Sequence, residues 1–147
     1  MIEKMEAIVR EKDTCVLATV SDNSPHCSLM SYVTDAECRE IYMVTHRETK
    51  KYLNLQKNPD VSLLIDTRAG HNMSGSRDDI IAALTISGTF QKIEDDAKRE
   101  RVRATLLDRH PVLREFLTDP GAEIIAVHCR SFQLLEGIRD SYFVSFC

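Results

Sequence analysis

The sequence predicts a mainly β (α+β) fold, an antiparallel barrel of six to seven strands with flanking helices. Apolar runs of strand length follow one another and are separated by short polar turns, which is typical of antiparallel pairing. The helical patterns are too few to supply one crossover per strand, so a doubly wound parallel sheet is not favoured. A sheet that closes on itself, with helices filling the gaps around it, fits this order of elements better.

The first 66 residues contain a helix, a hairpin, a third strand, a second helix and a fourth strand. Apolar residues recur at helical spacing over residues 2–12, with charged residues between them. A dense cluster of turn residues at 21–25 separates the first two strands. Pro59 ends the second helix, because proline cannot continue one. The expected elements are helix 2–12, strands 15–20, 26–34 and 41–45, helix 48–57, and strand 61–66.

The second half begins with a polar segment, 67–79, whose length indicates a functional or mobile loop. The long apolar run after it is interrupted by Gly88, where we expect a bulge or a bend. The next helix opens with three acidic residues, as the helix dipole prefers, and ends at His110-Pro111. The expected elements are strand 80–93, helix 94–109, a short helix at 112–117, strand 124–135 and a last short strand at 141–146.

Composition and charge narrow the class of protein. No repeat, linker or low-complexity tract divides the chain, so we expect a single domain over residues 1–147. The formal net charge of −4 argues against a nucleic-acid partner, because such domains are usually basic. No apolar run approaches the roughly 20 residues of a membrane span. The charged N-terminus lacks the apolar segment of a secretion signal, which predicts a cytoplasmic protein.

Cysteine and histidine usage predicts neither a disulfide scaffold nor a metal site. The five cysteines are odd in number and form no Cys-x-x-Cys pair. Cys15, Cys27 and Cys129 lie in strand-like runs, where we expect them to be small core residues. The five histidines show no metal-ligand spacing, either among themselves or with the cysteines.

The junction between the third strand and the second helix has the residues of a phosphate site. Thr45 ends the strand, and Thr49, Lys50 and Lys51 stand at the start of the helix. A helix N-terminus carries unpaired N–H groups and a partial positive charge. Hydroxyl groups and lysine ammonium groups add further donors and full charges. The alternative is that these residues are solvated charges on a surface helix.

Several short motifs, taken in order and at their spacings, are similar to those of one known family. They are Val16-Leu17-Ala18-Thr19-Val20 followed by a turn and Pro25-His26, then Tyr42-Met43-Val44-Thr45, Thr49-Lys50-Lys51, Asn54-Leu55-Gln56-Lys57-Asn58-Pro59, Val61-Ser62-Leu63-Leu64 and Ser87-Gly88-Thr89. In these features, which cover most of residues 1–135, the chain resembles the FMN-binding split-barrel proteins related to pyridoxamine 5′-phosphate oxidase.

This resemblance implies an FMN-binding homodimer with the flavin in a cleft at the subunit interface. It implies that the second strand runs beside the isoalloxazine and ribityl groups, and that the end of the third strand and the next helix hold the phosphate. The cofactor-binding residues so implied are Ser28, Leu29, Met30, Ser31 and Tyr32 on the strand, with Thr45, Thr49, Lys50 and Lys51 at the phosphate.

The chain departs from the family's oxidase at several positions. Ser28 replaces a basic residue at the start of the flavin strand, and Lys50 replaces an arginine, which loses a bidentate fork. The chain has no tryptophan, and only Arg130 and Arg139 lie near its C-terminus, without a matching motif. These differences argue against oxidation of pyridoxamine phosphate.

The first functional hypothesis is a small FMN-dependent oxidoreductase or flavin reductase acting on a small molecule. The flavin would carry the redox chemistry, so no catalytic residue is assigned. Met30 or Tyr32 could pack on the ring, and Arg68 and His71 could line the substrate side, although an exposed loop position is the simpler reading of His71. The alternatives are a non-catalytic carrier or sensor of FMN or haem, and a structural dimer with an empty cleft. The run 80–84 is apolar on both faces, which favours a sheet buried on both sides.

Overall fold

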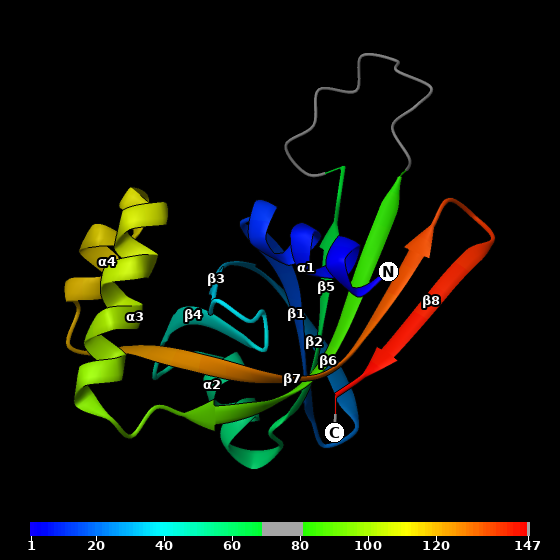
Figure 1. Ribbon diagram of the computed structural model, residues 1–147. Helices are drawn as coiled ribbons and strands as arrows, with labels where there is room; N and C mark the ends of the chain where they lie inside the picture. The colour runs from blue at the N-terminus through cyan, green and yellow to red at the C-terminus, as the bar shows by residue number, and fades with distance from the viewer. Residues whose placement is uncertain (69–80, 147) are drawn as a thin grey trace.

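The computed structural model describes residues 1–68 and 81–146. Its strands form one curled antiparallel sheet with helices around it (Figure 1), so the predicted fold class is confirmed. The first half contains α1 (Ile2–Glu11), β1 (Thr14–Ser21), β2 (Ser24–Ser31), β3 (Val33–Thr34), β4 (Glu40–His46), α2 (Lys50–Lys57) and β5 (Asp60–Asp66). The second half contains β6 (Ala82–Lys92), α3 (Asp96–Arg109), the 3₁₀ turn η1 (Pro111–Leu113), α4 (Arg114–Thr118), β7 (Ala122–Glu136) and β8 (Asp140–Ser145).

The sheet is organised around its longest strand, β7. The strand order is β2-β1-β5-β6-β7-β4-β3, and β8 also pairs with β7. The first part of β7 pairs with β4, from His46↔Ala122 to Glu40↔His128. The last part pairs with β8, while β6 runs along the other edge for almost the whole length. In Figure 1 the β7–β8 hairpin consequently lies on one side of the molecule and α3 and α4 on the other.

Apolar side chains gather in two clusters. The larger cluster fills the curled sheet, because alternate residues of β1, β5, β6 and β7 point inward. The smaller cluster lies under α3, where Val102 and Leu106 pack on Val33 and Tyr42. The pairing register of β6 and β7 shifts between Ser87 and Gly88, where the irregularity was expected, but the extra residue is Arg130 of β7. None of the helices in the described parts of the chain is long and apolar enough to cross a membrane.

Two expectations need correction, and a third is not tested. The single strand expected over 26–34 is broken at Tyr32, whose N–H donates to the Asp13 carbonyl at 3.0 Å, so that β3 pairs with β4. Cys27 is exposed, because it points to the face of β2 that no described segment of the chain covers. Within one chain the run 81–84 is buried on one face: Ala82 is in the core, whereas Ile81 is 47% exposed, so burial of the second face requires a partner and stays a prediction. Ile80 lies outside the described residues.

Candidate functional site

The β4–α2 junction, residues 45–51, is built by a buried strand that delivers the chain to a capped helix. All positions of β4 from Ile41 to Thr45 are buried, so its direction is fixed by the core. Thr49 is the N-cap of α2, and its hydroxyl oxygen accepts a hydrogen bond from the Tyr52 N–H at 3.3 Å. The helix therefore begins at Lys50, with its first turn next to the end of β4.

Both threonine hydroxyls of the junction are used to hold the turn. The Thr49 hydroxyl donates to the His46 carbonyl oxygen at 2.8 Å, and the Thr45 hydroxyl lies 3.1 Å from the Thr49 hydroxyl. Thr45 is only 2% exposed. These groups were expected to donate to a phosphate. In this conformation they instead stabilise the start of the helix, which leaves the lysines and the N–H groups of the first turn other than that of Tyr52 as donors.

Lys51 is brought to the second strand, as the predicted set requires. Its ammonium Nζ lies 3.3 Å from the Met30 sulfur, although the two residues are 21 positions apart in the chain. A thioether is a weak acceptor, and Lys51 forms no ion pair within the described residues. Burial lowers the pKa of this half-buried amine. An anion bound here would therefore relieve an uncompensated charge.

The other basic residues of the junction point elsewhere. Lys50 is exposed. The His46 ring lies against Gly121, where an added Cβ would collide with it, and its Nε2 is 3.4 Å from an Asp119 carboxylate oxygen. The Arg47 guanidinium donates to the Pro120 carbonyl and pairs with Glu123. Lys51 is thus the one cation of this junction, among those described, that turns toward β2.

The predicted residues of β2 divide between the two faces of the strand. Ser28 and Met30 pair with Leu17 and Cys15, whose side chains are buried, so they face the same side as the core. Leu29 and Ser31 face the opposite side, and Leu29 is 76% exposed. Because β2 is an edge of the sheet, part of its backbone has no strand partner and is open to a ligand.

Tyr32 lies apart from this set. Its side chain is fully buried, and its hydroxyl donates to the Val9 carbonyl oxygen of α1 at 2.8 Å. The imidazole Nε2 of His110, a 7% exposed residue at the end of α3, is 2.9 Å from the Tyr32 carbonyl oxygen. The Tyr32 side chain therefore has no free surface for a ring. Met30, the other residue expected to pack on the ring, is also buried, at 6% exposed.

Two polar residues of this region were missed by sequence reasoning. Asn54 follows Lys51 by one helical turn and is 3% exposed, and its amide nitrogen is 3.3 Å from the Thr19 hydroxyl of β1. Thr19 in turn stands opposite His26 on β2. One signal in the sequence could have pointed to Asn54. It is a polar residue three positions after Lys51 on the same helix, and it stands next to Leu55, which is buried.

The remaining candidates are placed as follows. Arg68 is exposed and pairs with Asp66 at 2.8 Å, while His71 lies outside the described residues. Where the structure describes the chain, no group of histidine, cysteine and acidic residues could hold a metal ion.

Comparison with known proteins identifies a family and a shared fold. The family model of pyridoxamine 5′-phosphate oxidase matches residues 1–135. No curated protein matches the chain significantly. Among solved structures, a haem-binding protein from Mycobacterium smegmatis is similar with a TM-score of 0.78 and 17% identity, over 95% of this chain and 56% of that one. The chain thus spans little more than half of that protein.

Two further structures match over nearly their whole length. A FAD-binding protein from Mesorhizobium loti has a TM-score of 0.73 and 12% identity, and the match covers 93% of this chain and 95% of that one. General Stress Protein 26 from Bacillus anthracis has a TM-score of 0.69 and 23% identity, with 98% and 97% coverage. Likeness at these identities shows a shared fold.

Proposed function

Because the chain belongs to the pyridoxamine 5′-phosphate oxidase family, we propose that it is an FMN-binding flavoprotein whose cofactor phosphate is held at the β4–α2 junction. The observation that carries this proposal is Lys51, a half-buried cation beside Met30 without a carboxylate partner in the described chain. A phosphate at this place would accept hydrogen bonds from the Lys51 ammonium group and from free N–H groups in the first turn of α2. FMN, once bound, supplies hydride and electron transfer.

The residues of the chain fit the rest of such a cofactor in distinct roles. Met30 lies on the side of β2 that faces α2, where its thioether contacts Lys51; it is only 6% exposed, so it supports the floor of the junction from within the core. Ser28 offers a hydroxyl on the same face. The open backbone edge of β2 offers N–H and C=O groups to the polar edge of an isoalloxazine. Lys50, exposed at the mouth of the junction, adds charge at longer range.

We propose further that the protein acts as a homodimer with the flavin at the subunit interface. The outer face of the sheet supports this, because Leu29, Val16 and Leu64 form one cross-strand row over β2, β1 and β5. Leu29 and Leu64 are 76% and 41% exposed, and Phe143 of β8 is 65% exposed. Exposed apolar side chains of this kind on one face of a sheet are typically covered by a partner. Sedimentation should give a dimer, and Leu29→Glu should shift it to a monomer.

The activity proposed is that of a small FMN-dependent oxidoreductase acting on a small molecule. Purified protein should show flavin absorbance, and NADH or NADPH should bleach it. Flavin absorbance that neither nucleotide bleaches would indicate a carrier instead. A Soret band without flavin bands would indicate a haem protein, which is the alternative suggested by the Mycobacterium smegmatis structure.

The phosphate site is tested by single lysine variants. Lys51→Gln should weaken FMN binding by about 1.5–3 kcal/mol, the usual strength of a hydrogen bond to a charged group, or roughly 10- to 150-fold. Lys50→Gln should cost less than about 1 kcal/mol, as is usual for an exposed charge. Lys57→Gln, in the last turn of the same helix, is the matched control and should change nothing. Equal FMN affinities in all three variants would place the phosphate elsewhere.

A further inference from the structure

A groove separate from the junction runs between α3, the end of α1 and the turn after β3. Its wider part has a volume of about 430 Å³, within the range of small-molecule sites. A second hollow of about 280 Å³ continues it along α3, and Thr34, Asp35 and Thr105 line both. The wider part is lined by Arg10, Val33, Thr34, Asp35, Ala36, Thr105, Asp108 and Arg109. None of these residues belongs to the β4–α2 junction.

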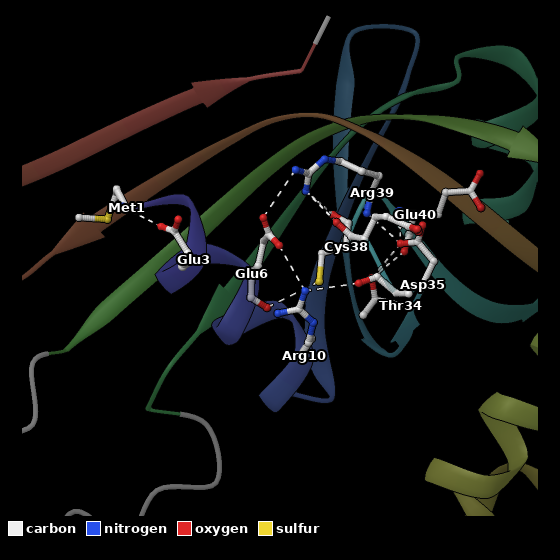
Figure 2. A network of polar contacts seen from close by, with 11 residues as sticks. Met1, Glu3, Glu6, Arg10, Thr34, Asp35, Cys38, Arg39 and Glu40 are labelled. Carbon is white, nitrogen blue, oxygen red and sulfur yellow. Dashed lines mark hydrogen bonds and ion pairs between the residues drawn. The ribbon is translucent and has the colours of Figure 1, made fainter.

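Two arginines from different helices converge on the wider part. The Arg10 guanidinium of α1 reaches Glu6 at 3.2 Å and the Ala36 carbonyl oxygen at 3.3 Å, so that it spans to the turn after β3 (Figure 2). Arg109 of α3 donates to two carbonyl oxygens at the end of α1, those of Glu11 and Lys12. Each guanidinium has five N–H donors, so both keep donors for a ligand.

The acidic residues near the groove are less available. One carboxylate oxygen of Asp35 accepts the N–H groups of Arg39 and Glu40 at 2.8 and 2.9 Å, which ties it into the turn. At the far end Lys98 is paired with Glu40 at 2.9 Å. Arg109 has no carboxylate partner within the described residues, and Asp108 is an exposed acid beside it. The wider part of the groove is therefore lined by two guanidinium groups and two carboxylates, and of these Arg10 is paired with Glu6 whereas Arg109 has no such partner among the described residues.

We infer that this groove binds a small organic anion. Its body lies against Thr34 and Thr105, and its carboxylate or phosphate is held by Arg10 and Arg109. Guanidinium groups suit this role because their planar fork matches the oxygens of such anions. The inference does not depend on flavin binding at the junction.

Backbone amide shifts of the full chain, followed by NMR, test the location. Benzoate and phenyl phosphate should both shift Thr34, Ala36 and Thr105, while benzylamine should not. Because phenyl phosphate could also enter the proposed FMN phosphate site, shifts confined to Thr49 and Lys51 would overturn the inference. Absence of any shift with benzoate would overturn it as well, whether or not FMN binds.

Substitutions of charged residues at the edge of the groove test whether its ligand is an anion. Asp108→Asn removes a repelling carboxylate without breaking any contact in the described chain, and it should tighten benzoate binding about 2- to 5-fold. Arg109→Gln should weaken it about tenfold, as expected for a charge-assisted hydrogen bond. Arg139→Gln, exposed in the turn between β7 and β8, is the matched control and should have no effect. Weaker or unchanged benzoate binding in Asp108→Asn would refute an anion site.

Discussion

Replacing Gly88 by alanine should destabilise the fold more than a change of one methyl group suggests. A Cβ at this position would lie 2.5 Å from Val127 Cγ1 and 2.8 Å from the His128 carbonyl oxygen. The Val127 methyl can turn away at a cost of about 1 kcal/mol for an off-rotamer side chain. The carbonyl belongs to the β7 backbone, so β6 must shift, and overpacking of this kind costs about 1–3 kcal/mol.

Part of this cost is offset, because alanine restricts the unfolded chain and so stabilises the native state by about 0.4–1 kcal/mol. The net loss should be about 2–3 kcal/mol, which lowers the melting temperature by roughly 5–10 °C for a chain of this size. Urea unfolding followed by circular dichroism measures it. Ser87→Ala, next to it and partly exposed on the other face, should stay within about 0.5 kcal/mol of the parent.

A double-mutant cycle separates the two collisions. In the presence of Val127→Ala the side-chain collision is absent, so Gly88→Ala should cost about 1 kcal/mol less than in the parent. The remaining cost reports the collision with the His128 carbonyl oxygen. If Gly88→Ala unfolded at the same urea concentration as the parent, the close approach of β6 and β7 described here would be incorrect.

Three further outcomes are expected. FMN affinity should fall as the pH rises, and the fall should begin below 10.5, the usual pKa of a lysine, because burial lowers the pKa of Lys51 and only the protonated amine attracts phosphate. In a fluorescence titration, Lys51→Gln should make the FMN affinity less dependent on pH. Of the four cysteines described, only Cys27 should react with a thiol reagent at neutral pH, as peptide mapping would show, because burial raises the pKa of the Cys15 thiol to about 12 and shields the other two. Gly121→Ala should displace the His46 ring but cost less than about 1 kcal/mol in urea unfolding, because only a side chain must move.

The sequence predicted the features that depend on local pattern. The irregularity at Gly88 followed from a glycine inside an apolar run, and the start of α2 followed from Thr49 before a helical pattern. Features that depend on distant partners were not accessible. Tyr32 interrupts a strand-like run because its hydroxyl reaches Val9 of α1 and its amide reaches Asp13, contacts that no local pattern encodes.

The candidate site shows the same division. The sequence shows that Lys51 stands at the start of a helix, but its approach to Met30 depends on how α2 packs beside β1 and β2. The prediction that Cys27 is a core residue was wrong, because the alternation of β2 leaves it on the face that none of the described elements covers. Which face of an edge strand is buried is decided by tertiary packing, which composition does not reveal.

The arrangement of β7 has a consequence for how the molecule assembles and opens. This strand bonds to β6 along one edge and to β4 and β8 in turn along the other, and its partners in β4 lie about 80 positions earlier in the chain. Pairings so remote in sequence slow folding, because a long loop must close before they form. No fraying at an edge can release β7, so the amide protons of its buried centre should exchange with deuterium only when the whole chain unfolds.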